Sequence, residues 1–353
     1  MTAIPRDLGL LPLVGVVAMH FLSGSAAGQA AEPALERHTF AEPHMGTRFK
    51  IILYAPDQAT AQQAARAAFA RVAELDRIMS DYDAASELMQ LCRKAGGPPV
   101  RVSEDLFRVL LRAQEMSRRS DGAFDVTIGP VVKLWRRSRK TLRLPEPTAL
   151  RQALELVGHQ RLRLDESTRS VQLLQPGMQL DLGGIAKGYA ADAAQQVLRK
   201  HGIHRALVAA GGDIVVSGPP PEAPRGWTIG ITPLDDDPTT PPKRYLTLQN
   251  AAVSTSGDAE QYVEIECRRY SHIVDPRTGI GLVGRVSATV VARDGTTADS
   301  LATALVVLGP DKGMPVIDAT EGAAALFIRK TEAGEEARMS QRFSQLAYRE
   351  EAR

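Results

Sequence analysis

The stretch Leu180-Asp-Leu-Gly-Gly-Ile-Ala-Lys-Gly-Tyr189 predicts a strand that runs into two glycines, followed by a helix with a lysine in its first turn. Glycines allow the backbone to approach a ligand closely, and the free N–H groups at a helix start attract anions. Lys187 would add a point charge for a phosphate group. The pattern is neither the GxxxxGK[ST] of a P-loop nor the GxGxxG of a dinucleotide fingerprint. An ordinary strand-to-helix turn explains the same residues, so this stretch alone leaves both interpretations open.

Outward from this stretch, helices and strands are predicted in mixed order rather than as strict βαβ repeats, which favours an α+β fold. No composition shift divides the chain after its first 30 residues, so we expect one catalytic domain at 31–345 and a charged tail at 346–353. The charged segment from Arg329 onward is expected to be loosely held.

The predicted elements are an extended segment at 38–54, a helix from Asp57 to about Met79, helices at 103–120 and 148–157, strands at 161–164, 170–174 and 179–182, a helix ending near His201, a strand at 206–210, several strands up to Val291, a helix after Thr297 and a final strand at 323–328.

Composition excludes several function classes. The chain has 353 residues, 44% hydrophobic and 24% charged, as in ordinary globular proteins. Its net charge of +2 is too balanced to indicate nucleic-acid binding. The two cysteines, Cys92 and Cys267, are expected to be small buried hydrophobes, although an exported chain could pair them. Without CxxC, HExxH or a Cys/His cluster, zinc and iron–sulfur chemistry are not indicated.

The N-terminal segment has the pattern of a secretory signal peptide at 1–30. Arg6 precedes a mostly apolar run from Leu8 to Leu22, and small residues follow up to Ala30. The run is short for a membrane span, so an uncleaved anchor is the weaker alternative. No cysteine lies near the cleavage region, which argues against lipid attachment. We therefore expect an exported, periplasmic protein, with association with the inner membrane as a further option.

Asp299 and Thr303 lie four residues apart in a predicted helix and so share one face of it. A carboxylate and a hydroxyl are hard oxygen donors, which suit Mg²⁺ better than zinc. Mg²⁺ is usually held by one or two protein oxygens together with substrate phosphates. An acidic residue near a helix start also favours the helix dipole, and an inward threonine often bonds its own backbone. The pair alone therefore leaves a structural role open.

Other segments carry polar groups at predicted strand ends. In Tyr270–Gly279, His272 is a candidate general base, and Asp275 could orient it or bind metal. The Asp-Pro-x-x-Gly pattern in the same segment is also a common turn. Further candidates with a structural alternative, as loop or core, are Thr255, Ser256, Gly257, Met45, Tyr82, Ala123, Phe124 and Asp125.

Taken together, these segments resemble the ApbE family, the FAD:protein FMN transferases, from Met45 to about Phe327. The matching blocks come in the family's order. They are Met45-Gly-Thr, Ser80-Asp-Tyr82 with Ser86-Glu-Leu, Gly122-Ala-Phe-Asp125, Asp181-Leu-Gly-Gly-Ile-Ala-Lys-Gly188, Gly211-Gly-Asp213, Thr255-Ser-Gly-Asp258, His272-Ile-Val-Asp-Pro-Arg-Thr-Gly279 and Thr297-Ala-Asp-Ser-Leu-Ala-Thr303. The resemblance implies a mixed α/β fold with antiparallel-rich sheets flanked by helices.

The resemblance also implies a function and roles for residues. Such enzymes cleave the FAD pyrophosphate in the presence of Mg²⁺ and attach FMN to a threonine of a target flavoprotein, which is expected to be exported or membrane-bound. AMP is released. By resemblance the metal is held by Asp299, Thr303 and the backbone carbonyl of Gly184. The implied FAD contacts are Met45, Tyr82, Ala123, Phe124, Asp125, Asp181, Lys187, Thr255, Ser256, Gly257, His272 and Ile273.

The chain departs from the family pattern at three places. Leu91-Cys92 replaces a frequent Asn, Val126 replaces a frequent Pro, and Ala259 replaces a frequent Tyr beside the flavin site. None is a proposed metal ligand. Two other functions remain open: Mg²⁺-dependent hydrolysis of FAD to FMN and AMP, and flavin binding without turnover.

Overall fold

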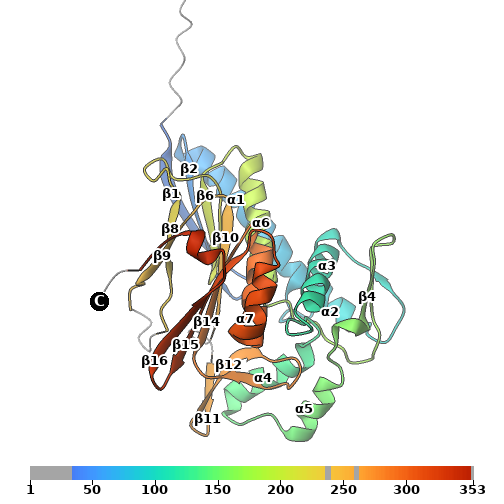
Figure 1. The fold of residues 1–353 in the computed structure, drawn as a ribbon. Helices are drawn as coiled ribbons and strands as arrows, with labels where there is room; N and C mark the ends of the chain where they lie inside the picture. Colours follow the sequence, from blue (N-terminus) through green and yellow to red (C-terminus); the bar gives the residue numbers. More distant parts are fainter. Residues whose placement is uncertain (1–33, 235–239, 258–261, 351–353) are drawn as a thin grey trace, which may run out of the picture. The chain divides into compact units, whose positions relative to one another are not determined.

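An eight-stranded antiparallel sheet forms the centre of the computed structural model, with strand order β1-β2-β6-β7-β10-β14-β15-β16 (Figure 1). The structure describes residues 34–234, 240–257 and 262–350, and Leu35–Arg353 is one compact unit. Residues 1–30, Asp258 and Ala259 therefore lie outside the described residues. The strands are β1 (Glu36–His44), β2 (Thr47–Ala55), β6 (Ala206–Ala210), β7 (Asp213–Val216), β10 (Ala251–Gly257), β14 (Val286–Ala292), β15 (Ala324–Thr331) and β16 (Gly334–Met339).

Three helices cover one face of this sheet: α1 (Gln58–Met79), α6 (Ala186–Lys200) and α7 (Gly295–Asp318) (Figure 1). The side chain of Asp57 caps α1 by accepting a 2.8 Å hydrogen bond from the Thr60 N–H. The predicted stripe of α1 packs into the main core, with Leu75 fully buried. The helix predicted after Thr297 begins at Gly295, because Asp294 provides the cap. The main core thus lies between these helices and the sheet.

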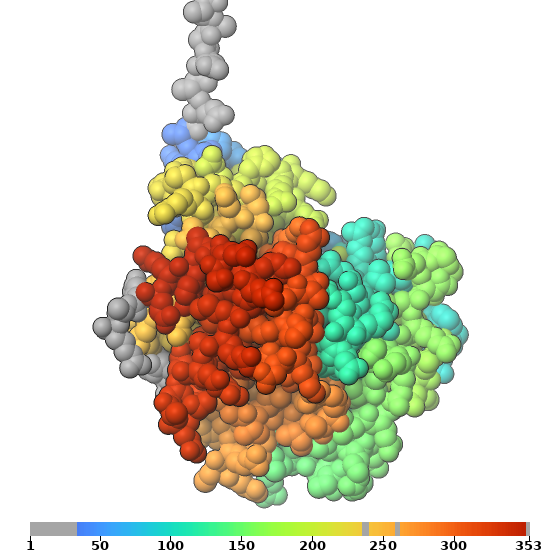
Figure 2. Space-filling model, in the orientation of Figure 1, coloured from blue at the N-terminus to red at the C-terminus, as the bar shows by residue number. Residues whose placement is uncertain are grey.

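The opposite face of the sheet is covered by a three-stranded sheet of β8 (Trp227–Ile231), β9 (Arg244–Leu248) and β17 (Ala347–Glu350). A second core with Phe343, fully buried, fills the space between the two sheets. The expectation that 323–328 is the final strand and that the chain is loosely held beyond it is wrong. β15 extends to Thr331, β16 and β17 follow, and in Figure 2 these red C-terminal residues form part of the surface. These elements were not predicted because exposed edge strands with charged side chains lack the alternating apolar pattern of a buried strand.

A third group of elements packs around Trp135. It contains α4 (Gly129–Thr141), α5 (Pro147–Leu154) and a sheet of β11 (Tyr262–Ile265), β12 (Arg268–Val274) and β13 (Gly281–Val283). The helix α4 is absent from the sequence-based expectations. The predicted strand at 179–182 is wrong, since among the described residues only Gln179 makes a bridge there, to Ile128.

The remaining elements complete the domain beside α7. They are α2 (Glu87–Cys92), β3 (Val100–Arg101), α3 (Glu104–Arg119), β4 (Leu162–Asp165) and β5 (Ser170–Leu173). Cys92 is buried as expected, whereas Cys267 is exposed in the β11–β12 turn; both are free thiols. Within 34–350, apart from the two undescribed gaps, no helix has the length and apolar character needed to span a membrane. The predicted α+β class with antiparallel sheets flanked by helices is confirmed.

Candidate active site

The site forms where α6 and α7 cross at a pair of glycines. A Cβ on Gly188 would lie 2.1 Å from the carbonyl oxygen of Gly295, and a Cβ on Gly295 would lie 2.6 Å from the carbonyl oxygen of Gly188. Any larger residue would force the helices apart, because real Cβ contacts of this length do not occur. The close approach lets the Gly188 N–H donate to Oδ2 of Asp299 at 3.2 Å. The two helices are thereby joined at the residues predicted to carry the chemistry.

A charge cluster of Lys187, Asp213 and Asp299 lies at this crossing, with both carboxylates buried and Lys187 half-buried. The Lys187 ammonium is 3.1 Å from Oδ2 of Asp213 and 3.6 Å from Oδ2 of Asp299. Burial raises the pKa of Asp299, and the negative charge of Asp213 raises it further, while Lys187 and the Gly188 N–H oppose the shift. The two carboxylates outweigh the burial of Lys187 and raise its pKa above the ordinary value. Two carboxylates and one ammonium leave a net negative charge in the cluster.

Asp213 reaches the cluster from the sheet rather than from a helix. It begins β7 directly after the Gly211-Gly212 turn, opposite Ser254 of β10. The Ser254 hydroxyl donates a hydrogen bond to Oδ1 of Asp213, which leaves Oδ2 for Lys187. Asp213 was recognised only as part of a family block, and no pattern in the sequence indicated that it pairs with Lys187.

Thr303 lies one helical turn beyond Asp299 and faces the glycine turn before α6. A Cβ on Gly184 would lie 2.9 Å from Oγ1 of Thr303 and 3.2 Å from Cε2 of Phe124. The Ser256 hydroxyl is 3.4 Å from the Thr303 hydroxyl. The predicted metal ligands and part of the predicted flavin site therefore adjoin one another in the structure.

Arg136 of α4 links Asp181 to the Ser80-Asp-Tyr segment. Its guanidinium lies 2.9 Å from Oδ2 of Asp181 and 2.5 Å from Oδ2 of Asp81, and it stacks over the ring of exposed Tyr82 at 4.1 Å. Burial and then the Asp181 charge raise the pKa of Asp81, whereas Arg136 lowers it. The other oxygen of Asp181 accepts from the Gly183 N–H at 2.8 Å. Arg136 was missed because α4 itself was not predicted.

Asp125 shapes the loop that presents Ala123 and Phe124, which are both buried. Its Oδ1 accepts hydrogen bonds from the N–H and hydroxyl of Thr127, at 2.8 and 2.7 Å. Its Oδ2 accepts from the His159 N–H at 2.8 Å. Burial raises the pKa of Asp125 in spite of these donors. The carboxylate is thus engaged in holding the loop, while its role toward FAD remains a prediction.

Met45 lies at the turn between β1 and β2, beside a surface hollow of about 510 Å³. Its N–H donates to Oδ2 of Asp76 at 2.9 Å, and it has a left-handed φ of 49°. Thr47, the first residue of β2, is close to the Gly211 turn, because a Cβ on Gly211 would lie 3.2 Å from the Thr47 hydroxyl oxygen. The turn that contains Met45 thus lies near the Gly211 turn, which precedes Asp213.

His272 is half-buried in β12, a strand that contacts α7, while Ile273 joins the main core. Trp135 holds the following turn by donating to the Gly279 carbonyl at 2.8 Å. Asp275 is paired with Arg277, whose Nη2 lies 2.8 Å from its Oδ2. This ion pair was not anticipated, since Asp275 was expected to orient His272 or bind metal.

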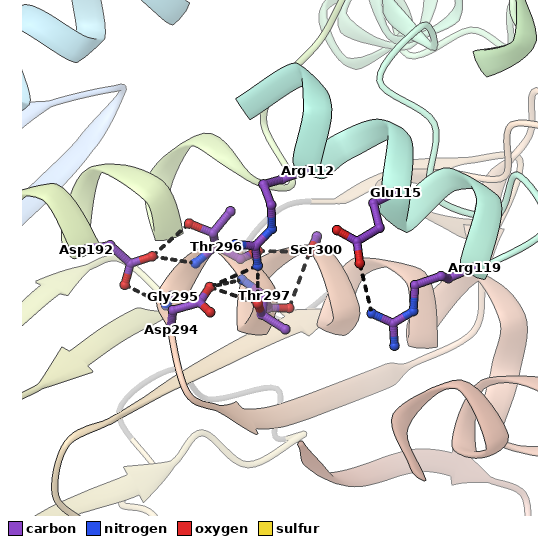
Figure 3. A network of polar contacts seen from close by, with 9 residues as sticks. All are labelled: Arg112, Glu115, Arg119, Asp192, Asp294, Gly295, Thr296, Thr297 and Ser300. Carbon is purple, nitrogen blue, oxygen red and sulfur yellow. Dashed lines mark hydrogen bonds and ion pairs between the residues drawn. The ribbon is translucent and has the colours of Figure 1, made fainter. Parts of the chain in front are cut away.

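A further network fixes the start of α7 beside the site (Figure 3). From α6, Asp192 accepts hydrogen bonds from the Gly295 N–H at 2.7 Å, the Thr296 N–H at 2.9 Å and the Thr296 hydroxyl at 2.7 Å. From α3, Arg112 donates to the Thr297 hydroxyl at 2.6 Å. Burial raises the pKa of Asp192 to about 6, although the bonds from α7 oppose the shift. Sequence patterns did not indicate this contribution from Asp192.

Comparisons with known proteins show the family of the chain. The ApbE family matches residues 45–327. An FAD:protein FMN transferase of Klebsiella pneumoniae is 36% identical over 81% of this chain and 87% of the relative. One from Treponema pallidum is 34% identical over 86% of this chain and 87% of the relative.

Solved structures show the same fold. The flavin transferase ApbE from Vibrio cholerae has a TM-score of 0.80 at 30% identity, over 89% of this chain and all of that one. The apo flavinyl transferase ApbE of Pseudomonas stutzeri has a TM-score of 0.77 at 28% identity, over 88% and 97%. The fold and the similar sequences are thus those of enzymes of the transferase class. The chain belongs to the ApbE family.

Proposed function

We propose that this protein is an FAD:protein FMN transferase that cleaves FAD, attaches FMN through a phosphoester to a threonine of a target flavoprotein and releases AMP. Family membership and the names of the relatives support the proposal. The observation that carries it is the cluster in which half-buried Lys187 lies within 4 Å of the buried carboxylates of Asp213 and Asp299. A lysine and an acidic group beside a glycine turn suit a pyrophosphate that binds together with a cation.

The donor set fits Mg²⁺. Asp299 supplies a carboxylate, Thr303 a hydroxyl and Gly184 a backbone carbonyl, which are the oxygen ligands that this ion takes. The described residues contain no group of three or more His, Cys, Asp or Glu side chains that could hold a metal, and Mg²⁺ does not require one. The net negative charge of the cluster also favours a cation. When bound, Mg²⁺ supplies neutralisation of the charge on the phosphate oxygens.

The chain's own residues position the reactants. We assign to Lys187 the contact with the pyrophosphate, and to Asp181, held by Arg136, a contact with FAD. We assign to His272 the role of general base, which takes the proton of the acceptor threonine hydroxyl. The new bond joins that oxygen to the FMN phosphorus, while the bond between this phosphorus and the oxygen bridging to AMP breaks. AMP leaves with the electron pair of the broken bond.

The location and the partner belong to the same proposal. We propose that the segment 1–30 is a secretory signal and that the enzyme acts in the periplasm on an exported or membrane-bound flavoprotein. The apolar run and the small residues up to Ala30 support this proposal. Detection of the mature N-terminus by mass spectrometry, after expression of the full chain, tests it. A product that retains Met1 would contradict cleavage.

Incubation of the protein with FAD, Mg²⁺ and a threonine-containing candidate flavoprotein tests the reaction. We expect an adduct of the mass of FMN on the acceptor, together with AMP, and neither product after addition of a chelator. AMP and FMN without an adduct on any tested acceptor would favour hydrolysis. Bound FAD with neither product would indicate a flavin-binding protein and contradict the proposal.

A further inference from the structure

A basic segment contains the helix α4. From Val126 to Pro145 the chain has six lysines and arginines and no acidic residue. The whole chain is nearly neutral, with 43 basic and 41 acidic residues. The positive charge is therefore concentrated here rather than spread evenly along the chain.

The spacing of these residues places four of them along one face of α4. Lys133, Arg136, Arg137 and Lys140 occupy positions i, i+3, i+4 and i+7, which lie in a row on a helix. The buried face of α4 is a different one, formed by Val131, Trp135 and Ser138.

Three of the four basic residues of this row are open to a partner. Lys133, Arg137 and Lys140 are exposed, and no ion pair among the described residues engages them. Leu142 and Leu144, which follow the helix, are exposed as well, with 62% and 41% of their surface accessible. We call the surface of Lys133, Arg137 and Lys140 with these two leucines the α4 basic face.

Helix stability does not explain this arrangement. Basic residues in the last turn favour the helix dipole, which accounts for Arg139 and Lys140. Lys133 and Arg137 lie outside the last turn, so the dipole does not account for them. Like charges three and four residues apart also repel each other along the row. Folding alone would favour neutral or acidic residues at Lys133 and Arg137.

The same helix forms part of the candidate active site. Arg136 lies within the row, and its guanidinium binds Asp181 and Asp81 inside the site. The preceding residue, Trp135, holds the turn after β12 by donating a hydrogen bond to the Gly279 carbonyl. A partner bound along the α4 basic face would thus begin at the active site and extend away from it.

We propose that the α4 basic face is the docking surface for an acidic segment of the acceptor protein, close to its target threonine. This inference rests on the proposed transferase function, since a hydrolase needs no such surface. Carboxylates of the partner would pair with the exposed lysines and arginine, and apolar residues would cover Leu142 and Leu144. Such rim charges mainly speed association and confer salt dependence.

The test uses two synthetic peptides with a central threonine, one flanked by aspartates and glutamates and the other by asparagines and glutamines. Binding of each labelled peptide to the full chain with FAD and Mg²⁺ is measured by fluorescence anisotropy. The test variant is K133E/R137E/K140E, and the control R66E/R118E/K200E changes exposed basic residues of other helices by the same total charge. We expect the acidic peptide to bind wild type and control more tightly than the neutral peptide. Its Kd should rise about tenfold in the test variant.

Four outcomes would overturn the proposal. The first is equal binding of the two peptides to wild type, and the second is an equal loss of acidic-peptide binding in the test and control variants. The third is a raised KM for FAD in the test variant. The fourth is that wild type binds vesicles with anionic lipid and the test variant does not, while peptide binding is the same in both. Formation of AMP from FAD by the wild type is followed separately. Its absence would contradict the proposed function, whatever the peptides do.

Discussion

At the scale of single residues, the site depends on two buried carboxylates that share one half-buried ammonium group. Asp213 and Asp299 contribute two negative charges, and Lys187 contributes one positive charge. Buried charges are costly unless they are paired, so the excess carboxylate favours either a proton or a cation. The raised pKa of Asp299 expresses this excess, because its largest causes are burial and the neighbouring Asp213. The cluster therefore favours the binding of a cation, and the raised pKa distinguishes Asp299 from Asp213.

The variant Asp299→Asn tests this cluster. The amide keeps the shape of the side chain but loses its charge, so AMP formation from FAD should fall by at least about 100-fold. Stability should not fall at pH 8. Because the pKa of Asp299 is raised in the folded state, this carboxyl stabilises the fold at low pH, and the stabilisation is lost as the pH rises through the folded-state pKa. Asparagine does not titrate, so the variant does not undergo this loss. AMP chromatography and urea unfolding measure the two effects.

The matched control for Asp299→Asn is Asp311→Asn, which changes an exposed carboxylate of α7 beyond the kink at Gly309. This control should retain full activity. Full activity in Asp299→Asn as well would contradict the assignment of Asp299 as a metal ligand.

The variant His272→Ala tests the proposed base. Loss of a positioned base should lower kcat by about 100-fold to 10,000-fold and remove the acid limb from the pH profile of transfer. Exposed His201 provides the control, and His201→Ala should behave as wild type. Near-normal transfer with an unchanged pH profile in His272→Ala would exclude His272 as the base.

At the scale of elements, the crossing of α6 and α7 sets the geometry of the site. Gly188 and Gly295 permit the close approach, and Asp192 binds the first N–H groups of α7 from the side of α6. These contacts join two helices that carry different parts of the cluster, Lys187 on α6 and Asp299 on α7. A shift of either helix would change the distance between these two side chains.

The variant Asp192→Asn tests the junction through the pH dependence of stability. Burial raises the pKa of Asp192 to about 6, so the protonated form is favoured in the folded state. Its contribution to stability is complete below the unfolded value of about 4 and is lost as the pH rises through 6. Wild type should therefore lose stability relative to Asp192→Asn between pH 4 and 7, by on the order of 3 kcal/mol.

Urea unfolding of wild type and Asp192→Asn at several pH values measures this difference. The opposite trend, in which wild type becomes relatively more stable as the pH rises, would mean that the hydrogen bonds from α7 outweigh burial. Thr278→Val changes an exposed residue outside the junction and should leave the pH dependence as in wild type.

At the scale of the whole domain, the central sheet is buried on both faces by different means. Helices α1, α6 and α7 cover one face and form the larger core, which also supports the site. The sheet of β8, β9 and β17 covers the other face around Phe343, which has no exposed surface. The C-terminal segment is thus a structural part of the domain and not an appendage.

The variant Phe343→Ala tests the second core. Truncation of a fully buried phenylalanine should lower the free energy of unfolding by about 3–5 kcal/mol. Met339→Ala is the control, because Met339 is 42% exposed and should change stability by less than about 0.5 kcal/mol. Equal stability of the two variants, measured by urea unfolding, would show that the second core contributes little.

Local patterns were sufficient for the elements that carry both a cap and an apolar stripe. The sequence predicts α1 from Asp57 and α3 from Ser103, and both side chains cap these helices in the structure. It did not predict α4, whose start has no side-chain cap and whose buried residues are interrupted by arginines and lysines. It also did not predict β16, because every residue of this edge strand is exposed.

The sequence by itself determined the fold class, the family and the residue types of the candidate site, since caps, periodicity and ordered motifs are local properties of the chain. Only the tertiary structure decided which residues meet. Lys187 pairs with Asp213 of a distant strand, and Arg136 pairs with Asp181. Such pairings depend on how helices and strands pack across the domain, and above all on the glycine contact between α6 and α7. No local pattern encodes distances between segments so far apart in the chain.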